Sequence, residues 1–486
     1  MSKPEQSLLD PADWDAYREA AHAALDVALD FSRQRGREPV WRPLPDELTA
    51  LDDPVPRTGQ PLNAVVAEIE QRILPYTLGN THPCFWGWVH GSGTPGGIVA
   101  QMLQGAINAN NGGREHAPVY IERQVLRWMC DLFDYPGDAS GLMCTGTSAA
   151  TLYGLAVARH RTLGADARRG GNAGARLTAY CSQQAHVSVV KAMELLGLGH
   201  DALRAIPVNA DFTLDVTALA AQLERDRAEG FQPFAIVSSA GSVNTGAIDD
   251  LDAIGTVSRD YGVWHHVDGA FGALLVTSDT LRHRLRGIET ADSIAFDFHK
   301  WMHVTYAAAC LLVRDGDEHL ATFETGQAYL QPESAGVAAG APWPSDYGID
   351  LSRGFEALGV WMQLKEHGVQ GIGAAIERNC DQAAWLGEQV ERDPRLELLA
   401  PVSLNIVCFR FSPPSVPPAV LDDLNRRLIV ALQVRGIAVP SLTTLNGRTA
   451  IRVCITNHRT RQSDLQMLLA GVVAIGEEML AGKEPG

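Results

Sequence analysis

The most constraining feature of this chain is an alternation of strand-like and helix-like segments between about residues 81 and 365. Apolar segments typical of buried strands recur at 177–181, 203–208, 234–237, 263–267 and 307–313. Helical patterns lie between them, as at 251–260, and Asp215 stands where a helix running to Gly230 would need an N-terminal cap. This alternation predicts an α/β fold, a mostly parallel sheet covered by helices on both faces.

Two regions of different character flank this alternation. Residues 1–80 carry amphipathic helical patterns and proline-rich connectors, which predict a helical arm that packs on something larger, such as a second subunit. After about residue 366, helices alternate with strands at 402–411 and 449–455, and 436–440 is expected to add a short edge strand. The predicted organisation is an N-terminal arm (1–80), a large domain (81–365) and a small α+β domain (366–486).

The composition argues against several classes of partner. A net charge of −17, with no basic run interleaved with aromatic residues, argues against nucleic acid. The longest apolar stretches fall short of the roughly 20 residues that span a bilayer, and no signal peptide is evident. The eight cysteines lack metal-ligand spacing, so we expect core thiols, no metal site and a reducing, cytoplasmic compartment.

One lysine stands out among the five in the chain. Lys300 lies in an apolar, strand-like run from Asp292 to Trp301. A buried ammonium is costly unless it is paired, neutralised or covalently consumed. From this residue alone two interpretations are open: a lysine at the core edge that reaches water, or a lysine that bonds covalently to pyridoxal phosphate (PLP).

Three further segments carry the groups that a PLP site requires. The hydroxyls of Thr147 and Ser148 stand at a predicted helix start, which suits a phosphate. Asp268 ends an apolar strand and could pair with the pyridine nitrogen, and His186 follows another strand and could stack on the ring. Each residue alone is equally typical of a helix cap or a strand end. Together they favour a PLP site, because open α/β sheets bind ligands at the carboxyl ends of their strands.

These segments resemble motifs of the group II PLP-dependent amino-acid decarboxylases, of the aromatic-L-amino-acid decarboxylase type. The matching motifs are Asp297-Phe298-His299-Lys300-Trp301 (Asn-x-His-Lys-Trp in the family), His266-Val267-Asp268-Gly269-Ala270 (His-Val-Asp-Ala-Ala), Gln184-Ala185-His186 (identical), Thr81-His82-Pro83 through Gly87 (His-Pro-x-Phe), and Ser239 through Gly246 (Gly-Thr-x-x-x-Gly). The resemblance extends from the arm to residues 452–457, nearly the whole chain.

The resemblance implies the type I, aspartate-aminotransferase-like fold and an intertwined homodimer with shared active sites. It implies decarboxylation of an L-amino acid to an amine and CO2, with an aromatic substrate favoured. The residues that it assigns to PLP are Thr147, Ser148, His186, Thr245, Asp268, Ala270, Asp297, His299 and Lys300. Those that it assigns to the substrate pocket are His82, Trp86, Trp88 and His90.

A tyrosine 29 residues after Lys300 helps to distinguish decarboxylation from oxidative deamination. Gln327-Ala328-Tyr329-Leu330 resembles the family segment whose tyrosine, reaching the partner subunit's site, protonates Cα after CO2 leaves. Relatives with phenylalanine there tend toward oxidative deamination to an aldehyde. A phenol can deliver a proton, so Tyr329 favours decarboxylation, with Lys300, His186 and Tyr329 as catalytic residues. The nearby stretch 334–341 has no structural pattern and is expected to be a mobile loop.

Several departures from the family leave the substrate open. His90-Gly91-Ser92 replaces Pro-Thr-Gly or Pro-Thr-Ala, tryptophans 86 and 88 replace smaller aromatics, and Asn108–Glu115 is unusually polar. That polar stretch suits an acidic or hydrophilic substrate, unless Arg114 and Glu115 simply pair with each other at the surface. The alternative functions are another type I PLP reaction, such as aldehyde synthesis, aldol cleavage or transamination, and a catalytically silent PLP-binding homologue.

Overall fold

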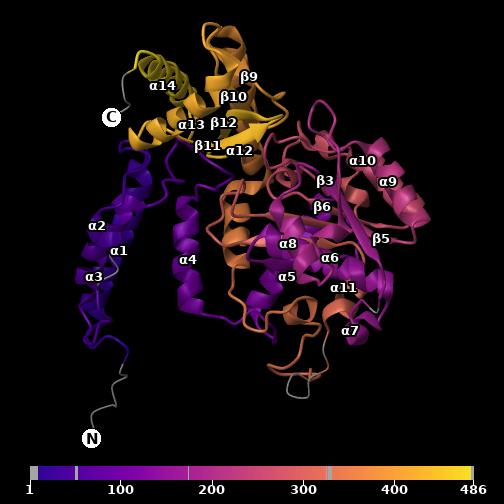
Figure 1. Ribbon diagram of the computed structural model, residues 1–486. Coiled ribbons are helices and arrows are strands. Elements are labelled where there is room, and N and C mark those ends of the chain that lie inside the picture. The colour runs from indigo at the N-terminus through magenta and orange to yellow at the C-terminus, as the bar shows by residue number, and fades with distance from the viewer. Residues whose placement is uncertain (1–8, 50–52, 173, 325, 327–330, 483–486) are drawn as a thin grey trace, which may run out of the picture.

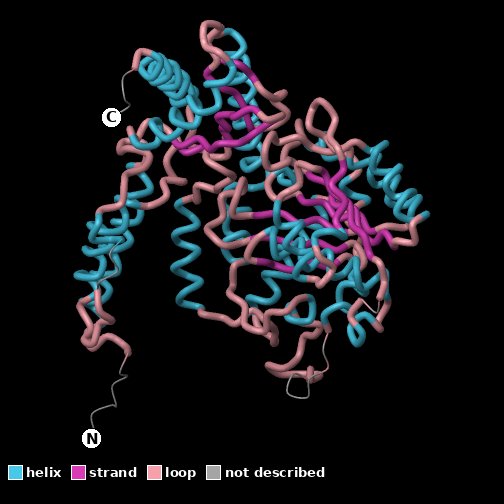
Figure 2. Tube along the Cα trace, in the orientation of Figure 1, coloured by secondary structure: helices cyan, strands magenta, loops and turns pink. Residues whose placement is uncertain are grey.

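The computed structural model describes residues 9–49, 53–172, 174–324, 326 and 331–482. These residues form a helical arm, a large domain around one sheet and a smaller domain around a second sheet (Figure 1). Figure 2 shows the strands gathered into these two groups. No helix in the described ranges is long and apolar enough to cross a membrane.

The large sheet confirms the predicted α/β fold. Its strands, in spatial order, are β2 (Ser140–Cys144), β8 (Ala309–Val313), β7 (Ser293–Asp297), β6 (Trp264–Asp268), β5 (Gln232–Ser239), β3 (Leu177–Ser182) and β4 (Leu203–Ile206). The pairs from β7 to β4 are all parallel, whereas β8 runs antiparallel to both of its neighbours. The carboxyl ends of β3, β5, β6 and β7 therefore meet at one edge.

Helices cover both faces of this sheet because its strands are apolar on both sides. In β5, Ala235 and Val237 pack toward α6 (Thr147–Leu163) and α8 (Val187–Leu195). Ile236 packs with α9 (Val216–Ala228) and α10 (Leu251–Tyr261). The remaining helices of this domain are α5 (Ala117–Leu132), α7 (Ala167–Gly170) and α11 (Gly316–Phe323). Asp215 caps α9 as predicted, with its side chain accepting from Ala218 N–H at 3.0 Å.

The small sheet differs from the prediction at one point. Its spatial order is β1 (Phe85–Trp86), β11 (Val439–Leu445), β12 (Arg448–Cys454), β10 (Ile406–Phe411) and β9 (Leu396–Leu398), with α12 (Ala357–Arg392), α13 (Pro418–Val434) and α14 (Gln462–Leu480) packed against it. The expected edge strand at 436–440 is instead an inner strand, β11. The prediction was wrong because β1, more than 350 residues away in sequence, pairs with β11 in parallel.

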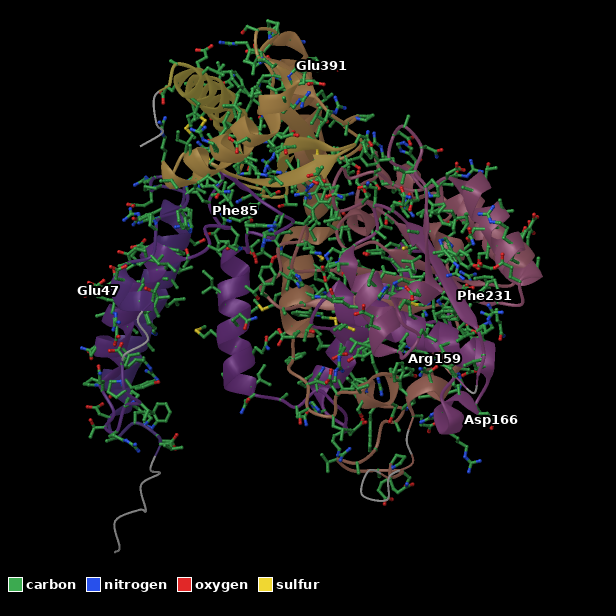
Figure 3. All side chains as sticks on the ribbon, viewed as in Figure 1. Glu47, Phe85, Arg159, Asp166, Phe231 and Glu391 are labelled. Carbon is green, nitrogen blue, oxygen red and sulfur yellow. The ribbon has the colours of Figure 1, made fainter. Side chains whose placement is uncertain are left out.

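The N-terminal arm lies beside the two domains (Figure 1). It comprises α1 (Trp14–Gln34), α2 (Asp46–Thr49) and α3 (Leu62–Glu68), and α4 (Pro95–Ile107) packs between α1 and α12. Neither α1 nor α3 buries a residue. Phe85, labelled in Figure 3, packs with Val40 of the arm and Val439 of β11, so it joins the arm to the small sheet.

Candidate active site

A cavity of about 300 Å³ lies where the carboxyl edge of the large sheet faces the small sheet. The strand ends of the large sheet and the segments that follow them contribute most of the predicted PLP residues: Thr147, Ser148, His186, Asp268, Ala270, Asp297 and Lys300. The small sheet contributes Ser441, Leu442 and Arg452, and Trp88 completes this wall. The structure therefore gathers residues from distant parts of the sequence around one space.

Lys300 lies three residues beyond the end of β7, at the cavity wall. Its Nζ is 2.7 Å from Oδ2 of Asp297, the buried last residue of that strand. The other oxygen of Asp297 accepts a hydrogen bond from Thr147 N–H at 2.7 Å. One carboxylate thus neutralises the Lys300 ammonium and also satisfies a free amide in the first turn of α6, where the helix dipole favours negative charge.

Asp268, the last residue of β6, is a carboxylate buried at the cavity. Its Oδ1 accepts from Ala270 N–H at 3.1 Å. Burial raises the pKa of Asp268, and the charge of Lys300 and the hydrogen bond from Ala270 N–H oppose that rise only in part. A cationic group within the cavity, such as a protonated pyridine nitrogen, would stabilise its charged form.

The start of α6 has free hydrogen-bond donors. Gly146 precedes the helix and supplies no side-chain cap. The hydroxyl of Thr147 is buried, and no acceptor for it exists among the described residues. Ser148, the next residue, is exposed toward the cavity. Hydroxyls and amides at a helix start form an anion site, so this turn fits a phosphate group.

His186 caps α8 and opens onto the same cavity. Its Nδ1 accepts from Ser188 N–H at 3.2 Å and lies 2.8 Å from the Ser188 hydroxyl, so the neutral ring carries its proton on Nε2. Desolvation lowers the pKa of His186, which favours this neutral form. A neutral imidazole beside the cavity can stack on an aromatic ring and still donate one hydrogen bond.

Two residues assigned to PLP by the resemblance lie behind the cavity wall. His299 accepts from Ala308 N–H at its Nδ1, 3.1 Å away, and its Nε2 is 3.8 Å from Asp297. Thr245 is buried, and its hydroxyl lies 3.0 Å from that of Ser242. Both residues contact segments that line the cavity, and neither lines the cavity itself.

The substrate-pocket residues suggested by the resemblance are dispersed. Trp88 lines the cavity. Trp86 is buried in the small-domain core, where its Nε1–H donates to the hydroxyl of Thr460. His82 is buried against the backbone of residues 38 and 84, and His90 bonds Tyr306. Tyr329 lies outside the described residues.

Several side chains of the polar segment Asn108–Glu115 contact other residues of the same chain. The Arg114 guanidinium stacks on Trp343, and Glu115 accepts from the Tyr120 hydroxyl, so these two side chains have separate partners. Asn111 donates to Glu122, which also pairs with Arg353 at 2.8 Å. None of these groups lines the cavity. The same segment contacts the stretch 334–341, which was expected to be a mobile loop: Glu115 N–H donates a hydrogen bond to Val337 O at 2.9 Å.

Arg452 is a site residue that the sequence reasoning did not single out. It is 3% exposed on β12, and its Nη1 donates to Trp88 O at 2.8 Å and to Ser441 Oγ at 3.2 Å. Its Nη2 is buried and has no hydrogen-bond acceptor among the described residues. The sequence signal for this residue was an arginine among the apolar residues 450–454, and the cost of burying a charge singled out Lys300 in the same way.

The residues at this cavity fit PLP. The buried Thr147 hydroxyl lacks the acceptor that a phosphate oxygen would provide. The pKa of the buried Asp268 carboxyl stays raised despite the nearby Lys300 charge, so a pyridinium would stabilise its carboxylate form. Lys300 supplies the amine for a covalent bond to the cofactor. Within the described ranges, no group of three or more His, Cys, Asp or Glu residues is arranged to hold a metal ion.

Comparison with known proteins agrees with this chemistry. Residues 45–412 match the pyridoxal-dependent decarboxylase conserved domain. The chain is 29% identical to an aromatic-L-amino-acid decarboxylase of Bacillus atrophaeus (95% of this chain, 96% of the relative), and 32% identical to an L-2,4-diaminobutyrate decarboxylase of Rhizobium meliloti (97% and 90%).

A solved structure extends the likeness to the fold. The glutamate decarboxylase domain of a Vibrio parahaemolyticus diaminobutyrate-pyruvate transaminase and L-2,4-diaminobutyrate decarboxylase aligns with a TM-score of 0.84 and 27% identity, over 98% of this chain and 97% of that chain. The resemblance inferred from the motifs, the type I fold and the PLP cofactor are thereby confirmed. The chain belongs to the pyridoxal-dependent decarboxylase family and is a PLP-dependent amino-acid decarboxylase.

Proposed function

We propose that this decarboxylase acts on an aromatic L-amino acid, with Lys300, His186 and Tyr329 as its catalytic residues. The observation that carries the site assignment is the convergence of Lys300, Asp268 and Thr147 on one cavity. An amine, a buried carboxylate and a helix-start hydroxyl are the three groups that PLP requires from a protein.

The proposed roles of Asp268, His186 and Lys300 rest on their positions at the cavity, and that of Tyr329 rests on its place in the family motif. Bound PLP supplies an electron-poor ring that accepts the electron pair of the bond to the substrate carboxylate. Asp268 would hold the positive charge at the ring nitrogen, which would keep the ring electron-poor. His186 would lie against the ring. Lys300 anchors the cofactor, and Tyr329 delivers its phenolic proton to the substrate Cα.

An aromatic substrate is supported by the apolar groups at the cavity. Trp88, Val89 and Leu442 line the cavity, and Trp88 is 54% exposed. A flat indole offers a stacking surface for an aromatic side chain. Arg452 supplies a cation for the carboxylate of the amino acid. The Bacillus atrophaeus relative, an aromatic-L-amino-acid decarboxylase, supports the same assignment.

Product analysis on a panel of amino acids tests this proposal. We expect CO2 and the corresponding amine, with tryptophan, tyrosine or phenylalanine turned over faster than glutamate or 2,4-diaminobutyrate. In air, Tyr329→Phe should lose amine and gain aldehyde and ammonia, with dissolved O2 as the two-electron oxidant that is reduced to hydrogen peroxide and water supplying the aldehyde oxygen. Tyr261→Phe, whose hydroxyl bonds surface Glu224, should behave as wild type. Faster turnover of a charged amino acid would refute the aromatic assignment, and unchanged amine from Tyr329→Phe would remove that residue's role.

We also propose that the enzyme is a cytoplasmic homodimer. Large apolar side chains are exposed on two neighbouring elements: Trp14 and Val65 on the arm, and Met102, Leu103 and Ile107 on α4. Helices that bury no residue of their own need a partner surface. All eight cysteines are free, which suits a reducing compartment. Sedimentation should give the dimer mass, and Leu103→Glu with Ile107→Glu should shift it to the monomer. A monomeric wild type would refute the dimer.

A further inference from the structure

Asn244 connects the two domains across the active-site cavity. It lies in the segment between β5 and α10 and contributes to the cavity wall. Its side-chain Nδ2–H donates to Gln184 Oε1 at 2.8 Å, and its Oδ1 accepts from the Thr443 hydroxyl at 2.8 Å. One amide group therefore links the large domain to the small sheet.

The backbone of Asn244 strengthens the same connection. Its carbonyl oxygen accepts from Cys408 Sγ and from Arg452 Nε, each at 3.2 Å. Cys408 lies on β10, Arg452 on β12 and Thr443 on β11, so three strands of the small sheet meet this one residue. All three side chains are buried, and losing their partner would leave buried polar groups unpaired.

On the other side, Gln184 belongs to the short turn that carries His186. Gln184 N–H donates to Ser182 Oγ at 3.0 Å, and Ala185 N–H donates to Ser182 O at 2.9 Å. The N–H of Gln183 is fixed as well, by Ile206 O at 2.9 Å. Because this turn is held at several points over a few residues, a displacement of Gln184 is transmitted to the His186 ring.

We propose that Asn244 is a positioning residue that sets the His186 ring against the cofactor by tying the Gln184–His186 turn to the small sheet. The same residue orients Arg452 through its carbonyl oxygen, so the ring on one wall and the guanidinium on the other share one support. This assigns to Asn244 a role in aligning the two walls of the cavity, beyond the decarboxylase activity itself.

A set of single variants tests each half of this connection. Asn244→Ala removes both side-chain bonds and should weaken PLP affinity of the purified apoenzyme about fivefold, which is the loss expected when about 1 kcal/mol of hydrogen bonding disappears. Thr443→Val and Gln184→Ala each remove one hydrogen bond. The PLP affinity of each variant should lie between that of Asn244→Ala and that of wild type. Thr444→Val on the neighbouring, exposed position of β11 is the matched control and should bind PLP as wild type does.

A double-mutant cycle separates positioning from general structural support. If Asn244 acts through His186, Asn244→Ala should weaken PLP binding less than twofold in a His186→Ala background. The same fivefold loss in both backgrounds would overturn the proposal. The visible circular dichroism of bound PLP provides a second readout, because it reports the setting of the cofactor: it should change in Asn244→Ala and Thr443→Val, and an unchanged spectrum in both would also overturn it.

Thr443→Val replaces a hydroxyl by a methyl group of similar size, so we expect the variant to fold. A change in its PLP affinity can therefore be attributed to the lost hydrogen bond. Its melting temperature as apoenzyme should match that of Thr444→Val. A loss of PLP affinity in Thr443→Val without a loss of apoenzyme stability supports positioning. Equal PLP affinity in Thr443→Val and Thr444→Val would contradict it.

Discussion

The large, mostly parallel sheet brings its polar groups to the cavity at or just beyond strand ends, whereas the small, mostly antiparallel sheet brings them from within its strands. Asp268 and Asp297 are the last residues of β6 and β7, and Lys300 follows β7 by three residues. Arg452, by contrast, lies inside β12, and Ser441 lies inside β11.

This difference suggests a division of roles between the two walls. Strand ends of a parallel sheet meet at one edge, next to helix starts, where a phosphate and a ring nitrogen can be bound together. A strand interior presents side chains on a flat face, which suits contact with a variable substrate group. The cavity side formed by the large domain, with Thr147, His186, Asp268 and Lys300, is termed the cofactor wall, and the side formed by Trp88, Ser441, Leu442 and Arg452 is termed the substrate wall. We therefore expect changes of side chains in the cofactor wall to affect cofactor binding, and changes of side chains in the substrate wall to affect the substrate KM.

Lys300→Ala should have the largest effect. Without its covalent anchor the enzyme should lose decarboxylation on the order of 10⁴-fold or more, as for the loss of a catalytic nucleophile. The visible absorbance of lysine-bound PLP should disappear from the purified protein. Lys365→Ala, on the exposed side of α12, is the control and should retain both. Retention of that absorbance in Lys300→Ala would exclude this lysine.

Asp268→Asn should cause the second largest loss of activity. Removing the charge that pairs with the ring nitrogen leaves a buried cation unpaired, which costs about 3 kcal/mol or roughly 100-fold in kcat. PLP affinity should fall as well, measured by titration of the apoenzyme. Asp260→Asn, an exposed change at the end of α10, should alter neither quantity. A kcat within threefold of wild type would contradict the proposed pairing.

The raised pKa of Asp268 should make the affinity for PLP depend on pH. In the apoenzyme, burial favours the protonated carboxyl, whereas a pyridinium favours the carboxylate, so cofactor binding lowers the pKa and releases the proton. PLP affinity should therefore increase as pH rises through the titration of Asp268 in the apoenzyme. Asp268→Asn should lack this increment when the two pH profiles of PLP affinity are compared. Identical profiles would contradict the linkage.

The cofactor wall was the part of the site most accessible from the sequence. Each of its groups follows an apolar strand within a few residues, so short motifs around Thr147, His186, Asp268 and Lys300 carried the information. Parallel topology then placed these strand ends together. The α/β fold was predicted for the same reason, because each strand and helix is a local pattern.

The substrate wall was less accessible because long-range pairing creates it. The parallel pairing of β1 with β11 joins residues 85–86 to 439–440, and no local pattern reports such a contact. With β1 in this position, Trp86 is buried in the core of the small domain, whereas Trp88 lines the cavity. His82 also lies away from the cavity, so the entry motif identified the family without identifying which of its residues reach the substrate.

Arg452→Ala tests the substrate wall. It should raise the KM for the amino acid about tenfold, because a charge-assisted pair with the carboxylate is lost. The absorbance and affinity of bound PLP should change less than twofold. Arg448→Ala, on the same strand and paired with Glu397, is the control and should leave the KM unchanged. A loss of PLP with an unchanged KM would assign Arg452 to the cofactor wall.

Thr147→Ala should have the smallest effect, a moderate loss of PLP affinity. It tests the cofactor wall as Arg452→Ala tests the substrate wall. Loss of one phosphate hydrogen bond costs about 1 kcal/mol, so PLP affinity should fall about fivefold, and Thr147→Ser should restore it because the hydroxyl is retained. Thr162→Ala at the far end of α6, whose hydroxyl bonds only the helix backbone, should leave PLP affinity unchanged. With PLP saturating, the KM of Thr147→Ala should equal that of wild type. If the KM rose instead, as expected for Arg452→Ala, the proposed separation between a cofactor wall and a substrate wall would fail.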